Sequence, residues 1–178
     1  MSEFSESYHL RGTARCEVIE LLERADLAGF IFPALDGWVS FVASGEPFRP
    51  NTNLIRANEG VLLRWVYGED HGWEFGLYKA KKLVCNYSCS WEEDIAVDGK
   101  VNHAQLEQEL GYPLPALQGE AGLGVFYPQS LERLFEVKPA YAFASAIGLS
   151  NYRWLSYEYL ERDSTNGHSL PAGVQALP

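Results

Sequence analysis

GVLLRWVYGEDHGWEFGLYKAKKLVCNYSCSW, residues 60–91, is the stretch that decides the fold. It contains three apolar-rich runs separated by two short polar turns, EDHG and KAKK. In the second and third runs apolar and polar residues alternate, which is typical of strands with one buried face and one wetter face. We therefore expect three consecutive antiparallel strands. The lysines of the second turn would discourage association at the sheet edge.

The flanking sequence predicts further helices and strands from periodicity, capping residues and turn chemistry. These are a helix at 14–25, strands at 29–32 and 38–43, helices at 103–110, 129–137 and 140–147, an extended segment at 112–128, and a last strand at 152–160. The predicted fold is a single α+β domain. Its antiparallel sheet of about five or six strands is covered by the N-terminal helix and by two or three short helices from the C-terminal half.

The composition supports one folded domain. The 178 residues are 47% hydrophobic and 13% aromatic, which is enough apolar material for a substantial core. We predict that residues 1–163 form this domain and that 164–178 form a loosely held tail. Residues 44–59 lack any periodicity, so we predict a surface loop there, anchored by Leu54 and Ile55.

Charge and cysteine content limit the classes of partner and the cellular compartment that we expect. The net charge is −10 and the acidic residues are spread along the chain, so the protein would repel nucleic-acid backbones and anionic membranes and would suit a basic partner protein. No apolar run is long enough for a membrane helix, and the N-terminus lacks the pattern of a secretory signal. Three cysteines, an odd number, favour a cytoplasmic location over a disulfide framework. The sequence assigns no oligomeric state.

Metal and cofactor motifs receive no support. Cys85 and Cys89 are four residues apart on one predicted strand, so their Cα atoms would be about 13 Å apart, too far to share a zinc ion or a disulfide. The glycines at 119, 122 and 124 have neither the spacing nor the flanking elements of a phosphate-binding loop. We therefore predict no cofactor and no metal site, and two buried thiols on the strand.

Three polar residues and a histidine beside the central strands are candidate binding residues. Glu92, Glu93 and Asp94 offer oxygen ligands but lack the spacing of a calcium loop, so a solvated acidic turn is the favoured interpretation. His71 follows two acidic residues in a predicted turn, where a general-base role is again less favoured than a solvated turn.

The tryptophans of the central stretch add apolar contact area. Trp73 and Trp91 are candidates for a binding surface, because aromatic residues are enriched at interfaces, although most tryptophans must fill the core. Together with His71 and the 92–94 acidic turn, they complete the set of candidate binding residues. No residue carries a catalytic motif.

Two functional hypotheses follow. The sequence favours a non-enzymatic protein-interaction domain, accessory or inhibitor-like toward a basic protein, on the basis of negative charge, abundant aromatics and the lack of a catalytic motif. The alternative is a small hydrolase or small-molecule-binding domain with its pocket between the sheet and the 44–59 loop. That alternative predicts a deep cavity with aromatic walls and a buried histidine or carboxylate.

Overall fold

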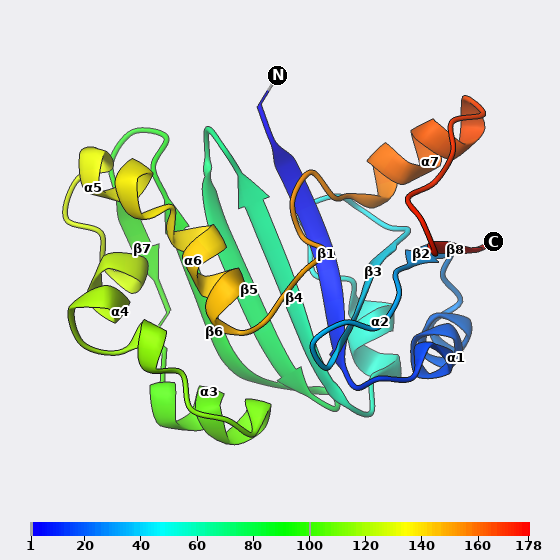
Figure 1. The fold of residues 1–178 in the computed structure, drawn as a ribbon, viewed down its shortest axis with the longest axis horizontal. Helices are drawn as coiled ribbons and strands as arrows, with labels where there is room; N and C mark the ends of the chain where they lie inside the picture. Colours follow the sequence, from blue (N-terminus) through cyan, green and yellow to red (C-terminus); the bar gives the residue numbers. More distant parts are fainter. Residues whose placement is uncertain (1, 100) are drawn as a thin grey trace.

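The computed structural model describes residues 2–99 and 101–178 and has an α+β fold built on one antiparallel sheet. Eight strands follow the order β7-β6-β5-β4-β1-β3-β2-β8 across this sheet (Figure 1). They are β1 (Phe4–Arg11), β2 (Gly29–Ile31), β3 (Trp38–Ala43), β4 (Val61–Gly68), β5 (Gly72–Lys79), β6 (Lys82–Ser90), β7 (Ala96–Asp98) and β8 (Gln175–Leu177). The α+β class is confirmed, whereas the predicted sheet of about five or six strands was too small.

The three central strands form as the alternation indicated. β4 pairs with β5 along its whole length, from Val61 opposite Lys79 to Gly68 opposite Gly72. β5 pairs in turn with β6, with a register irregularity between Leu77 and Tyr78. The two buried cysteines lie on β6 as free thiols, as predicted.

β1 is the strand that the sequence did not reveal, although it lies inside the sheet between β4 and β3. One of its faces carries Ser5, Ser7 and His9, which are fully buried. The His9 ring nitrogens lie 2.9 Å from the Ser7 and Ser40 hydroxyls, so its polar groups are satisfied inside the protein. A polar sequence of this kind resembles a surface segment, which is why the strand was missed.

Helices cover the two faces of the sheet unequally (Figure 1). The helical elements are α1 (Arg15–Ala25), α2 (Thr52–Ala57), α3 (His103–Leu110), the 3-10 turn η1 (Pro115–Leu117), α4 (Gly119–Phe126), α5 (Leu131–Val137), α6 (Pro139–Ala146) and α7 (Tyr157–Thr165). The C-terminal helices α3–α6 bury one face of β4–β6 in a large aromatic core. On the other face, α1 and α2 pack over β1 and β3 in a separate core.

Three segments differ from the sequence prediction. The 44–59 loop contains α2, because the Asn51 side chain caps this helix by accepting hydrogen bonds from the Asn53 and Leu54 amides, each at 3.1 Å. The extended segment predicted at 112–128 contains η1 and α4. The strand predicted at 152–160 does not form. Residues 152–156 precede α7 and 157–160 begin it, where the Ser156 hydroxyl caps the helix and overrides the β preference of the aromatic residues.

β8 forms within the segment predicted to be a tail. Its residues pair with β2, from Gly29 opposite Leu177 to Ile31 opposite Gln175. The strand is short and mostly exposed, and it lies at one edge of the sheet. That the segment as a whole is loosely held stays a prediction.

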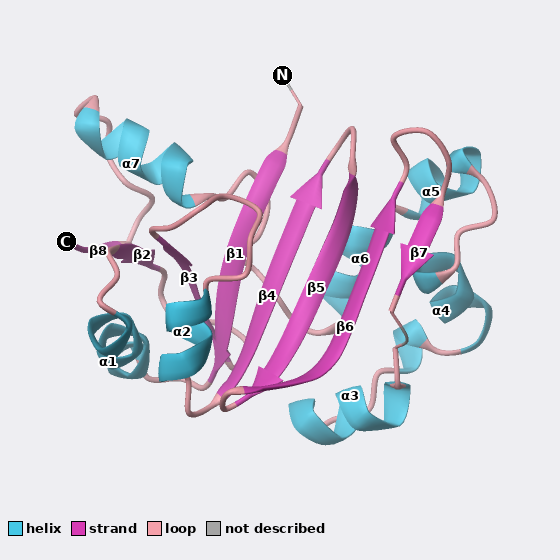
Figure 2. Cartoon of the chain, turned by 180° about the vertical axis from the view of Figure 1, so that it is seen from behind, coloured by secondary structure: helices cyan, strands magenta, loops and turns pink. Residues whose placement is uncertain are grey.

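One area of the sheet has no helix over it. Seen from behind, β4, β5 and β6 present a bare face, with α6 lying on their far side (Figure 2). The covered face carries Trp73, Phe75 and Leu77 from β5, and the bare face carries the alternating Glu74 and Gly76. The candidate functional site lies on this bare face.

Candidate functional site

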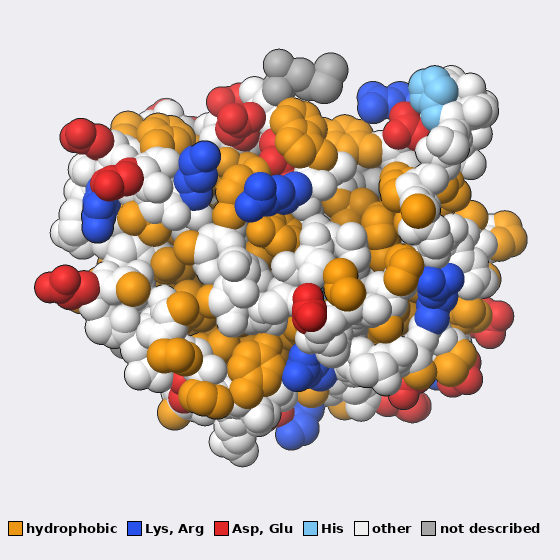
Figure 3. Space-filling view, viewed as in Figure 1, with side chains coloured by type: hydrophobic (Ala, Val, Ile, Leu, Met, Phe, Trp, Pro, Cys, Tyr) orange, Lys and Arg blue, Asp and Glu red, His pale blue; other side chains and the backbone are white. Residues whose placement is uncertain are grey.

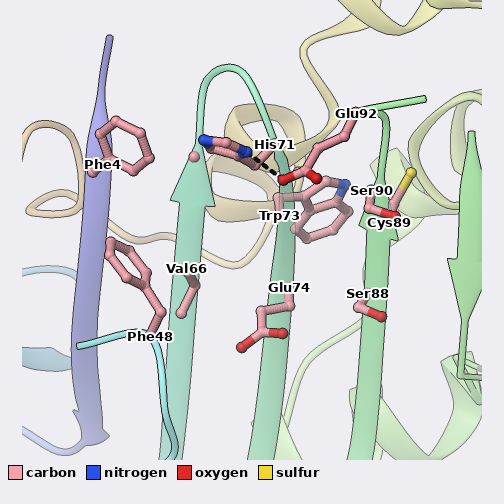
Figure 4. A pocket seen from close by; sticks show the side chains of 12 residues that line it. Phe4, Phe48, Val66, His71, Trp73, Glu74, Ser88, Cys89, Ser90 and Glu92 are labelled. Carbon is pink, nitrogen blue, oxygen red and sulfur yellow. Dashed lines mark hydrogen bonds and ion pairs between the residues drawn. The ribbon is translucent and has the colours of Figure 1, made fainter. Parts of the chain in front are cut away.

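A cavity of about 490 Å³ lies on the bare face of β4–β6 (Figure 4). The side chains around it come from β1, the 44–50 loop, the three central strands and the turn after β6. They are Phe4, Phe48, Val66, His71, Trp73, Glu74, Ser88, Cys89, Ser90 and Glu92, with Gly68 and Gly72 contributing backbone. We call this cavity the sheet groove.

Strand register places the groove side chains in a row. Glu6 on β1 is opposite Val66, Val66 is opposite Glu74, and Glu74 is opposite Ser88. Directly opposed residues of an antiparallel sheet point to the same face. Two carboxylates, an apolar side chain and a hydroxyl therefore share one line across four strands.

A buried arginine joins the carboxylates of this row. Arg64 is only 3% exposed, and its Nε donates a hydrogen bond of 2.8 Å to Glu6. Its Nη1 donates to Glu74, while its Nη2 is buried with no hydrogen-bond partner among the described residues. One guanidinium thus neutralises only part of the negative charge that Glu6 and Glu74 bring to the sheet.

The pKa values in this network reflect burial and charge together. Burial raises the pKa of Glu6, and the opposing effect of Arg64 is smaller. Burial alone would lower the pKa of Arg64, but the neighbouring Glu6, Tyr8 and Glu74 reverse this and raise it. Burial, with the Glu6 charge second, raises the pKa of Tyr8 to about 12. The arginine therefore stays charged and the tyrosine neutral.

The rim of the groove carries a histidine–carboxylate pair. His71 Nδ1 is hydrogen-bonded to Glu92, and both side chains are more than half exposed (Figure 4). The His71 ring also lies 5.4 Å from the Phe4 ring, between their centroids. No hydrogen bond joins His71 to Ser88, Ser90 or Cys89. The pair therefore lacks a hydroxyl or thiol nucleophile bonded to its imidazole.

Phe48 closes the groove from the 44–50 loop. Its ring makes an edge-on contact with Phe4 at 6.0 Å, yet the side chain is 43% exposed. Its backbone has φ of 60°, a conformation that is strained for a bulky residue, and its amide donates a 2.7 Å hydrogen bond to Glu6. The loop is also tied down by Asn51, whose side chain donates to the Ser44 carbonyl at 3.0 Å.

The structure brings together only some of the binding residues that the sequence singled out. His71 and Glu92 meet at the groove rim. Trp73 contributes to the groove wall, but it is 2% exposed and its ring packs in the core on the opposite face. Glu93 and Asp94 are exposed in the connection between β6 and β7, outside the groove.

Trp91 belongs to the other face of the sheet. It is buried, and its indole Nε1 donates a hydrogen bond of 3.1 Å to the Glu69 carbonyl. Its ring makes an edge-on contact with Phe135 at 6.4 Å. Trp91 also lines a second cavity, on the helix-covered side of the sheet.

Phe4, Phe48, Arg64, Glu74 and Ser88 were missed by the sequence prediction. The strict alternation of the central strands already placed Glu74 and Ser88 on the wetter face, so this signal could have found them. Phe48 lies in the stretch without periodicity, and Phe4 lies in the unrecognised strand. Neither carries a local signal that links it to the groove.

The described residues contain no group of three or more His, Cys, Asp or Glu side chains that could hold a metal ion. Among the helices of residues 2–99 and 101–178, none combines the length and apolar content needed to cross a membrane. Comparison with protein-family models, curated proteins and solved structures gives no significant match. The proposed function therefore rests on the geometry of the site.

Proposed function

We propose that the chain is a non-enzymatic cytoplasmic protein-interaction domain, whose sheet groove binds a basic segment of a partner protein. One observation carries the proposal. The groove combines apolar walls with carboxylates on a sheet face that no helix covers. An inhibitor-like or accessory role toward the basic partner fits this mode of binding.

The groove matches the two parts of a lysine or arginine side chain. Phe4, Phe48 and Val66 offer apolar surface for the aliphatic stem, while Glu74 and Glu92 offer acceptors for the charged end. His71 is the only basic side chain among the lining residues, and it is paired with Glu92. Charge complementarity therefore favours a cationic occupant over an anionic one.

Phe48 supports a binding role independently of charge. An exposed aromatic side chain forgoes the free energy that burial would give it. A strained backbone conformation persists only where other contacts hold it in place. Here the Glu6 carboxylate holds the Phe48 amide, so the exposed ring is fixed before any partner arrives. Preorganised aromatic residues of this kind are common centres of binding energy at interfaces.

The test uses an array of basic peptides, followed by isothermal titration calorimetry of the best binder. We expect Glu92→Gln to weaken binding about fivefold and raised salt to weaken it further, since exposed charges are screened. Glu120→Gln, on α4, is the matched control and should leave affinity unchanged. The proposal is wrong if no basic peptide binds, or if Glu92→Gln and its control behave alike.

A small-molecule ligand is the second candidate for the same groove. Its volume of about 490 Å³ lies within the range of ligand pockets, and Phe48 of the 44–59 segment lines it, which supports a pocket between the sheet and this segment. The geometry favours binding over hydrolysis, because no nucleophile is bonded to His71. Ester hydrolysis by the purified protein, abolished in His71→Ala, would instead support an enzyme.

A further inference from the structure

A second cavity, of about 290 Å³, lies on the helix-covered side of the sheet, beside the turn between β4 and β5. Five aromatic residues from the strands, α5, α6 and the segment before α7 line it: Tyr67, Trp91, Phe135, Tyr141 and Trp154. We call it the aromatic cage. Hydrophobic side chains gather on the surface of this face, among scattered charges (Figure 3).

The rings of the cage are inclined to one another around a common space. The Tyr67 centroid lies 5.1 Å from that of Tyr141 and 6.4 Å from that of Trp91, with interplanar angles of 51° in both pairs. Phe135 meets Trp91 at 78°. The lining rings that meet are therefore inclined to one another, while Tyr67 and Tyr141 also stack on Trp65.

Two of the cage residues are held out in solvent. Phe135 is 53% exposed and Trp154 is 49% exposed. Trp154 has φ of 51°, and its amide donates a 2.7 Å hydrogen bond to the buried Glu3 carboxylate. A buried acid thus maintains a strained, exposed tryptophan, which is an arrangement typical of binding sites rather than of cores.

Two acidic side chains accompany the rings of the cage. Glu3 and Glu69 both line the cage, and the pKa of Tyr67 rises to about 12 through burial and then through the charges of Glu69, Glu3 and Asp70. Lys138 is the one cationic lining residue, and it is exposed at the rim. Arg153 lies outside the lining, 4.4 Å from the Tyr141 ring centroid, so one cation already packs against this ring.

The buried carboxylate of the cage, Glu3, already accepts several hydrogen bonds. Glu3 accepts hydrogen bonds from the Ser5 hydroxyl, the Tyr141 hydroxyl and the Trp154 amide. Glu69 accepts one from the Glu3 amide at 3.0 Å. A primary ammonium or guanidinium would bring several N–H donors that need acceptors. A quaternary ammonium has none, and it is recognised by aromatic faces and a negative field.

We propose that the aromatic cage binds a trimethylammonium group. Its volume of about 290 Å³ lies at the lower end of the range of ligand pockets, which leaves room for such a head group. The cage and the sheet groove lie on opposite faces, so this proposal does not depend on the proposed function.

The first test compares choline with its uncharged isostere 3,3-dimethylbutan-1-ol by isothermal titration calorimetry and tryptophan fluorescence. Choline should bind at least about tenfold more tightly, since the two differ in charge but hardly in shape. Equal affinities, or no binding of either compound, would overturn the proposal.

Variants locate the binding. Trp154→Ala should weaken choline binding at least about fivefold, while Trp154→Phe should restore part of it because a smaller π face remains. Phe48→Ala in the sheet groove is the matched control and should not change the affinity. Choline affinity that is unaffected by Trp154→Ala, or lost equally in Phe48→Ala, would place the ligand elsewhere.

Two further probes distinguish the source of the group. One is a peptide that contains trimethyl-lysine, and the other is free choline. Tighter binding of the peptide points to a methylated protein, and tighter binding of choline points to a small molecule. The proposal is contradicted if Trp154→Ala weakens the binding of an unmodified lysine peptide as much as it weakens the binding of the methylated one.

Discussion

On one face of β4–β6, Trp73, Phe75 and Tyr87 pack against α4 and α6, whereas on the other face Glu74 and Ser88 border a groove that no helix covers. Both faces belong to the same three strands, because successive side chains of a strand point to opposite faces of the sheet. The difference shows that alternation gives these strands an apolar side and a more polar side, and that α3–α6 pack on the apolar side. The covered face is held by burial, and the bare face retains charged and polar groups that a partner can contact.

β1 links the two faces in a second way. Glu3, just before the strand, accepts a hydrogen bond from the amide of Trp154, and Glu6 within it accepts one from the amide of Phe48. Each of these aromatic residues has positive φ and an exposed ring. The N-terminal segment therefore fixes one exposed aromatic residue on each side of the sheet.

The largest effect is expected on the covered face. Phe143 is fully buried, and its ring stacks on Phe75 with 4.2 Å between centroids. Phe143→Ala should lower the free energy of unfolding by about 3–5 kcal/mol, because it removes aromatic burial and leaves a cavity. Urea denaturation measures this. A loss below about 1 kcal/mol would show that this core is loosely packed.

Arg64→Met tests the charged network beneath the bare face. Removing the guanidinium leaves Glu6 and Glu74 without their cation, and we expect a loss of about 3 kcal/mol at pH 7. The pKa of Glu6, already raised by burial, should rise further. The folded variant then binds a proton more tightly than its unfolded chain, so its stability should recover as pH falls.

A double variant controls for the loss of packing. Glu6→Gln combined with Arg64→Met removes the uncompensated charge and should regain part of the stability lost at pH 7. Urea denaturation of both variants at two pH values separates the effects. An Arg64→Met loss that does not vary with pH, and is not relieved by Glu6→Gln, would assign the arginine a packing role alone.

The buried His9, on the covered face, makes the free energy of unfolding depend on pH. Burial lowers its pKa from 6.5 to about 3, so the folded state keeps it neutral while the unfolded state takes up a proton below pH 6.5. The contribution of neutral His9 to the free energy of unfolding is fully present above pH 6.5. It is lost as pH falls toward 3, at about 1.4 kcal/mol per pH unit. By pH 5 the loss is about 2 kcal/mol.

His9→Gln is the comparison for this prediction. Glutamine does not titrate, so the variant should show a shallower decline in unfolding free energy between pH 6.5 and pH 5. Denaturant titrations at several pH values provide the measurement. Parallel profiles for the two proteins would mean that the pKa of His9 is the same in the folded and unfolded states.

The smallest effect is expected for Ser88→Ala on the bare face. Its side chain borders the groove without a hydrogen bond to another described residue, and its loss should change stability by less than about 0.5 kcal/mol. Thermal unfolding checks this. A substantial destabilisation would show that the bare face is also structural.

The sequence predicted the elements whose signals are local. The alternation in residues 60–91 identified β4–β6, and the helix expected at 103–110 is α3, which Asn102 caps. β1 escaped because its polar residues are buried through contacts that the sequence does not display, such as the hydrogen bond of His9 to the distant Ser40. Likewise, Phe48 and Phe4 meet His71 only through the strand order, which no local pattern encodes.

We expect a basic partner to bind the bare face and not the helix-covered one. Phe48 and Phe135 are exposed to a similar degree on these opposite faces, so they form a matched pair. Titration calorimetry with the best basic peptide should show affinity reduced about tenfold in Phe48→Ala and unchanged in Phe135→Ala. The opposite pattern, or equal losses in both variants, would contradict the account.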